Sequence, residues 1–114
     1  MVLKKFLAGN EEPYFSLSKQ IDKAIVTSRI FTGWGFFTDY AVPDSLAVRN
    51  LHGYIIDVMA LSNDSDKIYG FRLLVEDGKT DSLEGYCFID GWDIEFDKVE
   101  LEYLSDKRIH RFHE

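Results

Sequence analysis

The sequence predicts a single-domain protein, mainly β to α+β, built on an antiparallel meander sheet that forms a sandwich or a half-barrel. Apolar and polar residues alternate with a period of two through much of the second half. The dipeptides Asp77-Gly78 and Asp90-Gly91, both favoured in two-residue hairpin turns, are spaced by one strand length. The chain has 114 residues, 46% of them hydrophobic, so residues 1–114 are expected to bury one core without metal or disulfide crosslinks.

The first half of the chain is less regular and is expected to contain at most one or two short helices. Four apolar residues have helical spacing within Ser16–Ser28: Leu17, Ile21, Ala24 and Ile25. The β-branched run Ile25–Thr27 favours a strand instead, so both readings stay open. Ile30–Thr38 is strand-like, with a bend expected at its two glycines. Pro43-Asp44 is expected to begin a short helical turn.

The second half is expected to contain three regular strands before residue 90. The first covers residues 51–61 and places on one face Tyr54, Ile56, Val58 and Ala60. The second has alternating apolar residues on its buried face: Tyr69, Phe71, Leu73 and Val75. Asp77-Gly78 then turns the chain into a return strand over Leu83–Ile89.

Residues 92–104 fit either one helix or two short strands with a phase change at Asp97-Lys98. The strand interpretation buries all six apolar residues, whereas a helix leaves Ile94 and Leu101 on its far side. We therefore predict two short strands, or one strand with a bulge. On that interpretation the acidic residues point outward and form one face of the sheet: Asp93, Glu95, Asp97, Glu100 and Glu102.

The negative charge is concentrated in one stretch of the chain. The whole sequence has 20 acidic and 13 basic side chains, a formal net charge of −7. The stretch from Glu76 to Asp106 has 11 of the acidic residues against Lys79 and Lys98, so the rest of the chain is slightly basic. Because apolar residues are interspersed through this stretch, it predicts a folded acidic surface. Such a surface favours a basic protein partner and disfavours nucleic acid and anionic membrane.

The sequence shows no motif for catalysis, metal binding or cofactor binding, so no catalytic residue, metal site or cofactor is expected. Cys87 is the only cysteine, and it lies mid-strand between apolar residues, which favours a buried structural thiol over a nucleophile. No apolar run approaches the ~20 residues that span a bilayer. The N-terminal apolar run is too short for a secretory signal, so a cytoplasmic protein is expected.

In its size, acidic charge and lack of a catalytic motif, the chain resembles the immunity proteins of bacterial toxin systems, such as those of contact-dependent growth inhibition. The resemblance implies a small bacterial protein that binds a basic, nuclease-type toxin and blocks its active site or substrate groove. The expected partner-binding residues are Glu84, Asp90, Trp92, Asp93, Glu95, Asp97, Glu100 and Glu102, with Trp92 as an aromatic anchor. Trp34 and Phe36 are candidates for a second, aromatic interface, with core packing as the alternative.

Two other functions stay open. A small-molecule-binding or enzymatic β-barrel would direct four side chains into one cavity: Trp34, Tyr40, Tyr54 and Cys87. An acidic secretion chaperone would need a dimer interface and a long first helix. Oligomeric state is not predicted, and neither is the position of the basic C-terminal segment from Lys107 to His113 relative to the acidic face.

Overall fold

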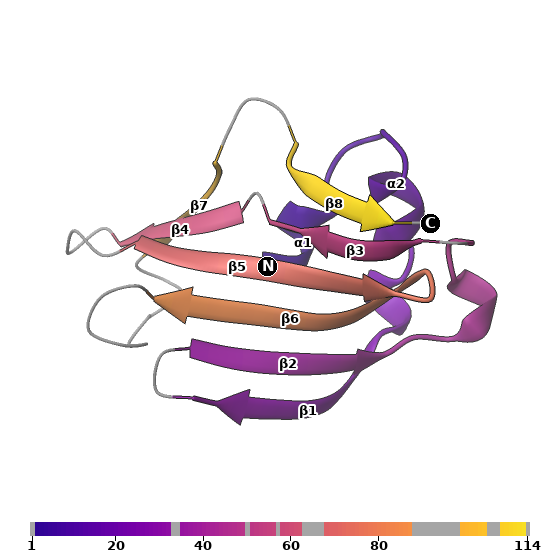
Figure 1. Ribbon diagram of the computed structural model, residues 1–114, viewed down its shortest axis with the longest axis horizontal. Helices are drawn as coiled ribbons and strands as arrows, with labels where there is room; N and C mark the ends of the chain where they lie inside the picture. Colours follow the sequence, from indigo (N-terminus) through magenta and orange to yellow (C-terminus); the bar gives the residue numbers. More distant parts are fainter. Residues whose placement is uncertain are drawn as a thin grey trace.

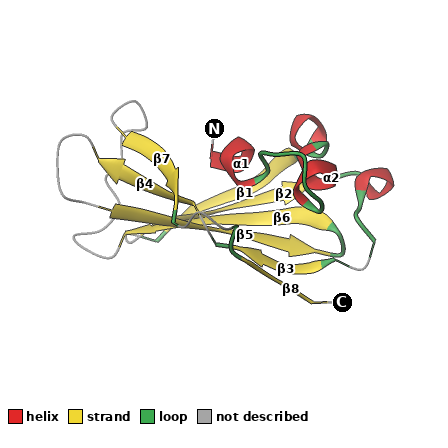
Figure 2. Ribbon diagram, turned by 90° about the horizontal axis from the view of Figure 1, so that it is seen from above, coloured by secondary structure: helices red, strands yellow, loops and turns green. Residues whose placement is uncertain are grey.

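The protein folds into one open antiparallel sheet with short helices packed against one of its faces (Figures 1 and 2). The computed structural model describes residues 2–32, 35–49, 51–56, 58–62, 68–87, 99–104 and 108–113. Within the described residues, the helical elements all precede residue 47: α1 (Val2–Phe6), α2 (Tyr14–Ser18) and the 3-10 turns η1 (Ile21–Lys23) and η2 (Asp44–Leu46). The prediction of a mainly antiparallel β fold with short N-terminal helices is confirmed.

The sheet has a path of six strands with two more attached at one side. The strands are β1 (Ile25–Phe31), β2 (Gly35–Ala41), β3 (His52–Ile55), β4 (Val58–Ser62), β5 (Ile68–Glu76), β6 (Lys79–Cys87), β7 (Val99–Tyr103) and β8 (His110–His113). The order along the path is β1-β2-β6-β5-β3-β8, while β4 pairs with both β5 and β7. Because β1 and β8 are the two ends of this path, the sheet is open and does not close into a barrel.

The core lies between the helices and the inner face of the sheet. The alternation predicted for β5 is confirmed, since Tyr69, Phe71, Leu73 and Val75 are each at most 3% exposed. They pack in one cluster with Val2 and Phe6 of α1, Leu7, and Tyr14 and Leu17 of α2. The helices cover only this inner face, and the opposite face of the sheet is left uncovered by them (Figure 2).

The β5–β6 turn forms at Asp77-Gly78, as the sequence predicts. Both residues have positive φ, 51° at Asp77 and 75° at Gly78, which suits the twist of a two-residue hairpin. A Cβ atom at Gly78 would lie 1.9 Å from the Val48 carbonyl oxygen, so only glycine fits there. The turn is therefore fixed both by its own conformation and by the chain that packs over it.

The helix considered for Ser16–Ser28 does not form over that length. The structure has α2 and η1 there, and the β-branched residues from Ile25 onward begin β1. Pairing of Ile25 with Ala41 and of Val26 with Tyr40 favours the strand, because β-branched side chains pack well in a sheet. The turn predicted at Pro43-Asp44 is confirmed as η2.

The single face predicted for residues 51–61 is wrong at Tyr54. Tyr54 is 36% exposed and Ile55 is fully buried, while Val58 and Ala60 are buried as predicted. Ile55 pairs with Leu73 and Met59 pairs with Gly70, so four steps along this segment match three steps along β5. The extra residue changes the phase between β3 and β4.

The C-terminal residues form a strand and are not a free tail. β8 pairs with β3, with His110 opposite Ile55 and His113 opposite His52. Upstream of it, the Arg108 guanidinium donates hydrogen bonds to the carbonyl oxygens of Phe6 and Ala8. The predicted return strand is observed as β6, and the second of the two predicted short strands as β7. The Asp90-Gly91 turn and the strand expected at 92–96 lie outside the described residues.

Candidate protein-interaction surface

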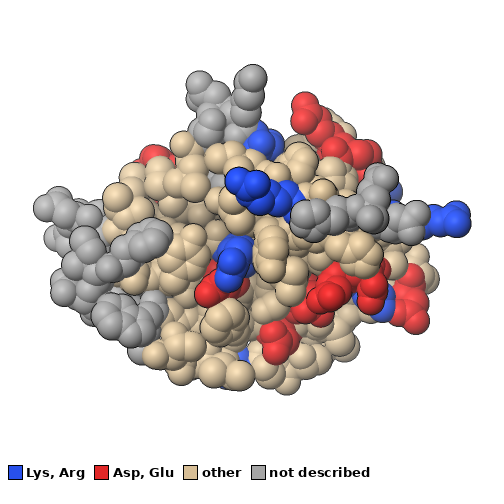
Figure 3. Space-filling model, viewed as in Figure 1, with Lys and Arg blue, Asp and Glu red and all other residues tan. Residues whose placement is uncertain are grey.

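The face of the sheet turned away from the helices is the candidate site, and we call it the open face. Figure 3 views this face directly. No helix covers the sheet on this side, so the side chains that alternate with the core residues along its strands are accessible to solvent. These side chains come from β1, β2, β3, β5 and β6 and include Ile30, Phe37, Asp39, Tyr54, Arg72, Glu76, Asp81, Glu84 and Tyr86.

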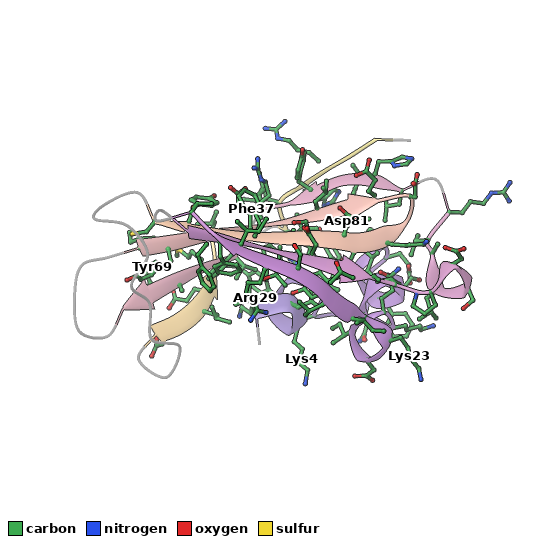
Figure 4. The ribbon with its side chains drawn as sticks, turned by 90° about the horizontal axis from the view of Figure 1, so that it is seen from below. Lys4, Lys23, Arg29, Phe37, Tyr69 and Asp81 are labelled. Carbon is green, nitrogen blue, oxygen red and sulfur yellow. The ribbon has the colours of Figure 1, made fainter. Side chains whose placement is uncertain are left out.

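All six carboxylates that lie within the described strands belong to this side of the sheet. Glu100 and Glu102 are exposed on β7, alternating with Leu101 and Tyr103, which pack against the core. The other four are Asp39, Glu76, Asp81 and Glu84, on the three neighbouring strands β2, β5 and β6. Three basic side chains, Lys4, Lys23 and Arg29, lie on the opposite side of the sheet, while Phe37 and Asp81 lie on the open face (Figure 4).

Four carboxylates gather at the end of the open face near the β5–β6 turn, and we call them the carboxylate cluster: Asp39, Glu76, Asp77 and Asp81. Asp81 is an extra residue of β6, because Leu74 pairs with Ser82 and Val75 with Thr80. Partial burial raises the pKa of the Asp81 carboxyl, and repulsion by Glu76, Asp39 and Asp77 raises it further. Figure 3 shows acidic side chains gathered on this part of the face.

Lys79, the basic residue closest in sequence, does not neutralise the carboxylate cluster. The Lys79 ammonium is bonded to Asp44 of η2, and this bond lowers the pKa of the Asp44 carboxyl. His52 Nδ1 lies 3.2 Å from the Asp77 backbone nitrogen and 3.8 Å from the Asp77 carboxylate. In the described part of the chain, no ion pair joins a lysine or arginine to any of the four carboxylates.

The cluster does not have the geometry of a metal centre. Within the described residues there is no group of three or more His, Cys, Asp or Glu side chains that could hold a metal ion. The Asp39 carboxylate is instead engaged by a hydrogen bond of 3.0 Å from the Ser28 hydroxyl. The four carboxylates form a patch of distributed negative charge and are not a set of ligands for one small cation.

The centre of the open face is held by an ion pair. The Arg72 guanidinium is bonded to the Glu84 carboxylate across the β5–β6 pair, and it lies 5.0 Å from the centre of the Tyr54 ring. Glu84, one of the predicted partner-binding residues, is therefore already paired within the sheet. Beside it the Tyr86 ring lies over Gly70, where a Cβ atom would be 2.5 Å from a ring carbon. Burial is the main cause that raises the pKa of the Tyr86 hydroxyl.

Exposed apolar side chains border the acidic groups. Phe37 is 37% exposed and pairs with Ile30, which is 57% exposed. Phe36, named above as a candidate interface residue, is only 8% exposed and belongs to the core, because it alternates with Phe37 along β2. Phe37 therefore takes the aromatic role on the open face. The sequence alone does not decide between Phe36 and Phe37, because both faces of residues 35–38 are apolar or small and no alternation identifies the buried side.

The structure thus describes four of the ten predicted site residues. Glu84 is paired with Arg72, Phe36 is in the core, and Glu100 and Glu102 are exposed on the outer side of β7. The remaining six lie outside the described residues: Trp34, Asp90, Trp92, Asp93, Glu95 and Asp97. Asp39, Glu76, Asp77 and Asp81 were not predicted, because only the pairing of β2, β6 and β5 brings them together.

The side chains named for the ligand-binding alternative do not converge. Tyr54 lies on the open face, whereas Cys87 is buried on the inner face at 4% exposed. Tyr40 packs against the core, and burial raises the pKa of its hydroxyl. The described residues also contain no long first helix of the kind the chaperone alternative requires, since α1 and α2 have five residues each.

No helix in the described part of the chain is long and apolar enough to cross a membrane. Comparison with protein-family models, with curated proteins and with solved structures finds no match to this chain.

Proposed function

We propose that the chain is a binding protein that neutralises a basic protein, and that it does so through the open face of its sheet. The observation that carries the proposal is the carboxylate cluster, in which Asp81 is repelled by Asp39, Glu76 and Asp77 and in which no lysine or arginine of the described residues forms an ion pair with any of the four carboxylates. A lysine or arginine placed among these groups relieves that repulsion. The cluster therefore favours a cationic surface over a neutral one.

The exposed apolar groups give such a complex its desolvated centre. Phe37 and Ile30 lie beside each other on β2 and β1, next to the acidic groups rather than within them. An exposed aromatic bordered by charges is the arrangement found at binding hot spots, where the aromatic side chain supplies affinity and the charges supply association rate and orientation. The ion pair between Arg72 and Glu84 fixes the positions of these two side chains at the centre of the open face.

The partner that fits this surface best is a basic, nuclease-type toxin domain in the cytoplasm of a bacterium. A groove that binds nucleic acid is lined with lysine and arginine, and an acidic sheet face is complementary to it. The resemblance of the chain to toxin immunity proteins and its formal charge of −7 support this role. Inhibition then follows from occupying the substrate groove, and it needs no catalytic group on this chain.

Affinity capture from the native host tests the proposal when it compares two matched double variants. Asp39→Asn with Asp81→Asn removes two charges from the cluster, whereas Glu11→Gln with Glu12→Gln removes two exposed charges outside the sheet. We expect the wild type and the Glu11/Glu12 variant to retain one basic protein at low salt, and the Asp39/Asp81 variant to lose it. Equal retention by both variants would contradict the assignment of the cluster.

A further inference from the structure

One row of residues crosses the open face from the carboxylate cluster to the far edge of the sheet. The strand registers place five residues in this row, in order from β2 to β8: Asp39, Ser82, Leu74, Tyr54 and Arg111. Because cross-strand partners point to the same face of a sheet, all five side chains lie on the open face. The row therefore begins at a carboxylate and ends at a cation.

The neighbours of Arg111 along β8 agree with this position. His110 and Phe112 point to the inner face, since His110 Nδ1 lies 2.6 Å from the hydroxyl of the buried Tyr14 and Phe112 packs against the core. Arg111 alternates with them and is exposed. β8 is the last strand of the path, so Arg111 lies at the edge of the open face (Figure 1).

Arg111 is a cation that the sheet itself does not use. Four strand-to-strand steps separate it from Asp39, about 19 Å at the usual spacing of neighbouring strands, which is too far to compensate that carboxylate at physiological salt. Arg72 is paired with Glu84, whereas within the described residues Arg111 forms no ion pair. The open face thus has an acidic end and a separate basic end.

We propose that Arg111, beside the exposed ring of Tyr54, binds a carboxylate of the basic partner and so fixes the orientation in which that partner docks. The inference rests on the proposed function, because it adds a second contact to the same face. A guanidinium holds a carboxylate through two parallel hydrogen bonds, which determine direction as well as distance. The partner surface that fits has lysine or arginine opposite the cluster and an aspartate or glutamate about 19 Å away.

A nuclease that uses metal ions presents both kinds of charge in one groove. Its lysines and arginines bind the phosphates, and its carboxylates hold the metal ions. The Arg111 guanidinium offers such a carboxylate a positive charge in place of the metal. A surface that is only basic does not satisfy Arg111, so this residue selects one kind of partner among basic proteins.

Charge reversal at position 111 separates this proposal from simple attraction between opposite charges. Arg111→Glu and Lys23→Glu change the net charge of the chain equally, and Lys23 lies on the opposite side of the sheet (Figure 4). If overall charge alone decided affinity, both variants would bind the captured basic protein more tightly. We expect Lys23→Glu to bind at least as tightly as wild type, and Arg111→Glu to raise Kd at least ~10-fold. Equal affinity of the two variants would overturn the proposal.

The Asp39/Asp81 double variant distinguishes a failure of this proposal from a failure of the proposed function. If the double variant loses the captured protein while Arg111→Glu retains it fully, the cluster binds the partner and the role of Arg111 is wrong. If Arg111→Glu loses the protein while the double variant retains it, the contact at position 111 stands and the assignment of the cluster is wrong.

Carbodiimide cross-linking of Arg111→Lys identifies the partner group directly. The reagent joins a lysine amine to a carboxylate that already lies in contact with it, forming an amide bond. We expect mass spectrometry of the complex to find position 111 joined to an aspartate or glutamate of the captured protein, and Lys23 not joined to it. A complex of Arg111→Lys that forms without this cross-link would contradict the proposal.

Discussion

Gln20 Oε1 accepts two hydrogen bonds from Thr80, one from the backbone N–H at 2.8 Å and one from the hydroxyl at 3.1 Å. The Gln20 Nε2 donates to the carbonyl oxygens of Leu46 and Gly78, and the side chain is fully buried. A single residue from the helical layer thus joins η2, the β5–β6 turn and the start of β6. Thr80 directly precedes Asp81, so this network also positions the carboxylate cluster.

Replacing Gln20 by alanine is expected to destabilise the protein by about 2–4 kcal/mol. The substitution leaves the Thr80 N–H buried without its partner, removes one of the two hydrogen bonds to the Gly78 carbonyl, and leaves a void in the core. Urea unfolding followed by circular dichroism measures the difference. Lys19→Ala, at an exposed neighbouring position, is the control and is expected to change stability by less than ~0.5 kcal/mol. A similar effect of both variants would show that the network contributes little.

Asp81→Asn is expected to stabilise the protein at neutral pH. The pKa of the Asp81 carboxyl is higher in the folded state than in the unfolded state, so the charged form is disfavoured by folding. Stability from this group is therefore fully present below the unfolded pKa and is lost as pH rises through the folded pKa. Asparagine does not ionise, so the Asp81→Asn variant does not lose this stability as the pH rises.

The measurement is the difference in unfolding free energy between Asp81→Asn and wild type as a function of pH. We expect the difference to favour the variant at neutral pH and to shrink as the pH falls below the titration of Asp81. The pKa of Asp44 is lowered, mainly by its hydrogen bond to Lys79, so its effect on stability changes with pH in the opposite direction. This effect is the same in both proteins and cancels in the difference. A difference that does not vary with pH would contradict the repulsion described for the cluster.

Phe37→Ala is expected to weaken binding of the basic partner by about 2 kcal/mol, or ~30-fold in Kd, mainly through faster dissociation. The reason is the loss of a desolvated aromatic contact on the open face. Phe15→Ala is a close control, since Phe15 is 42% exposed, against 37% for Phe37, but lies on α2. Surface plasmon resonance gives both rate constants. Equal losses for the two variants would place the interface elsewhere.

Arg108→Ala is expected to destabilise the protein by about 2–3 kcal/mol. Its guanidinium lies 3.9 Å from the centre of the Tyr14 ring and 4.7 Å from that of Tyr103, and it bonds to the carbonyl oxygens of α1 and the residues after it. These contacts of the Arg108 guanidinium join the C-terminal segment to the N-terminal helix. Thermal unfolding compares it with Arg111→Ala, at an exposed position of β8, which is expected to have little effect. The account of Arg108 is wrong if the two variants unfold at the same temperature.

Local signals made part of this fold predictable. The alternation in β5 and the Asp77-Gly78 turn were predicted because each depends on residues close in sequence. The phase change between β3 and β4 was not, since it follows from pairing with β5. The strand at β8 was also missed, because a short basic segment becomes a strand only when the β3 edge is beside it.

The same division holds for the candidate site. The outward position of Glu100 and Glu102 followed from alternation with Leu101 and Tyr103. The carboxylate cluster could not be found in this way, because Asp39 is distant in sequence from Glu76 and Asp81. Charge counting identified the acidic character of the surface, and strand order determined which carboxylates meet.

The most direct measurement of the central claim is the association rate constant of the captured basic protein with the wild-type chain, at low and high ionic strength. If the carboxylate cluster guides the encounter, the rate constant falls steeply as salt is added, and Asp39→Asn with Asp81→Asn reduces that salt dependence. A rate constant that is the same at both ionic strengths, or a salt dependence untouched by the double variant, would contradict the account.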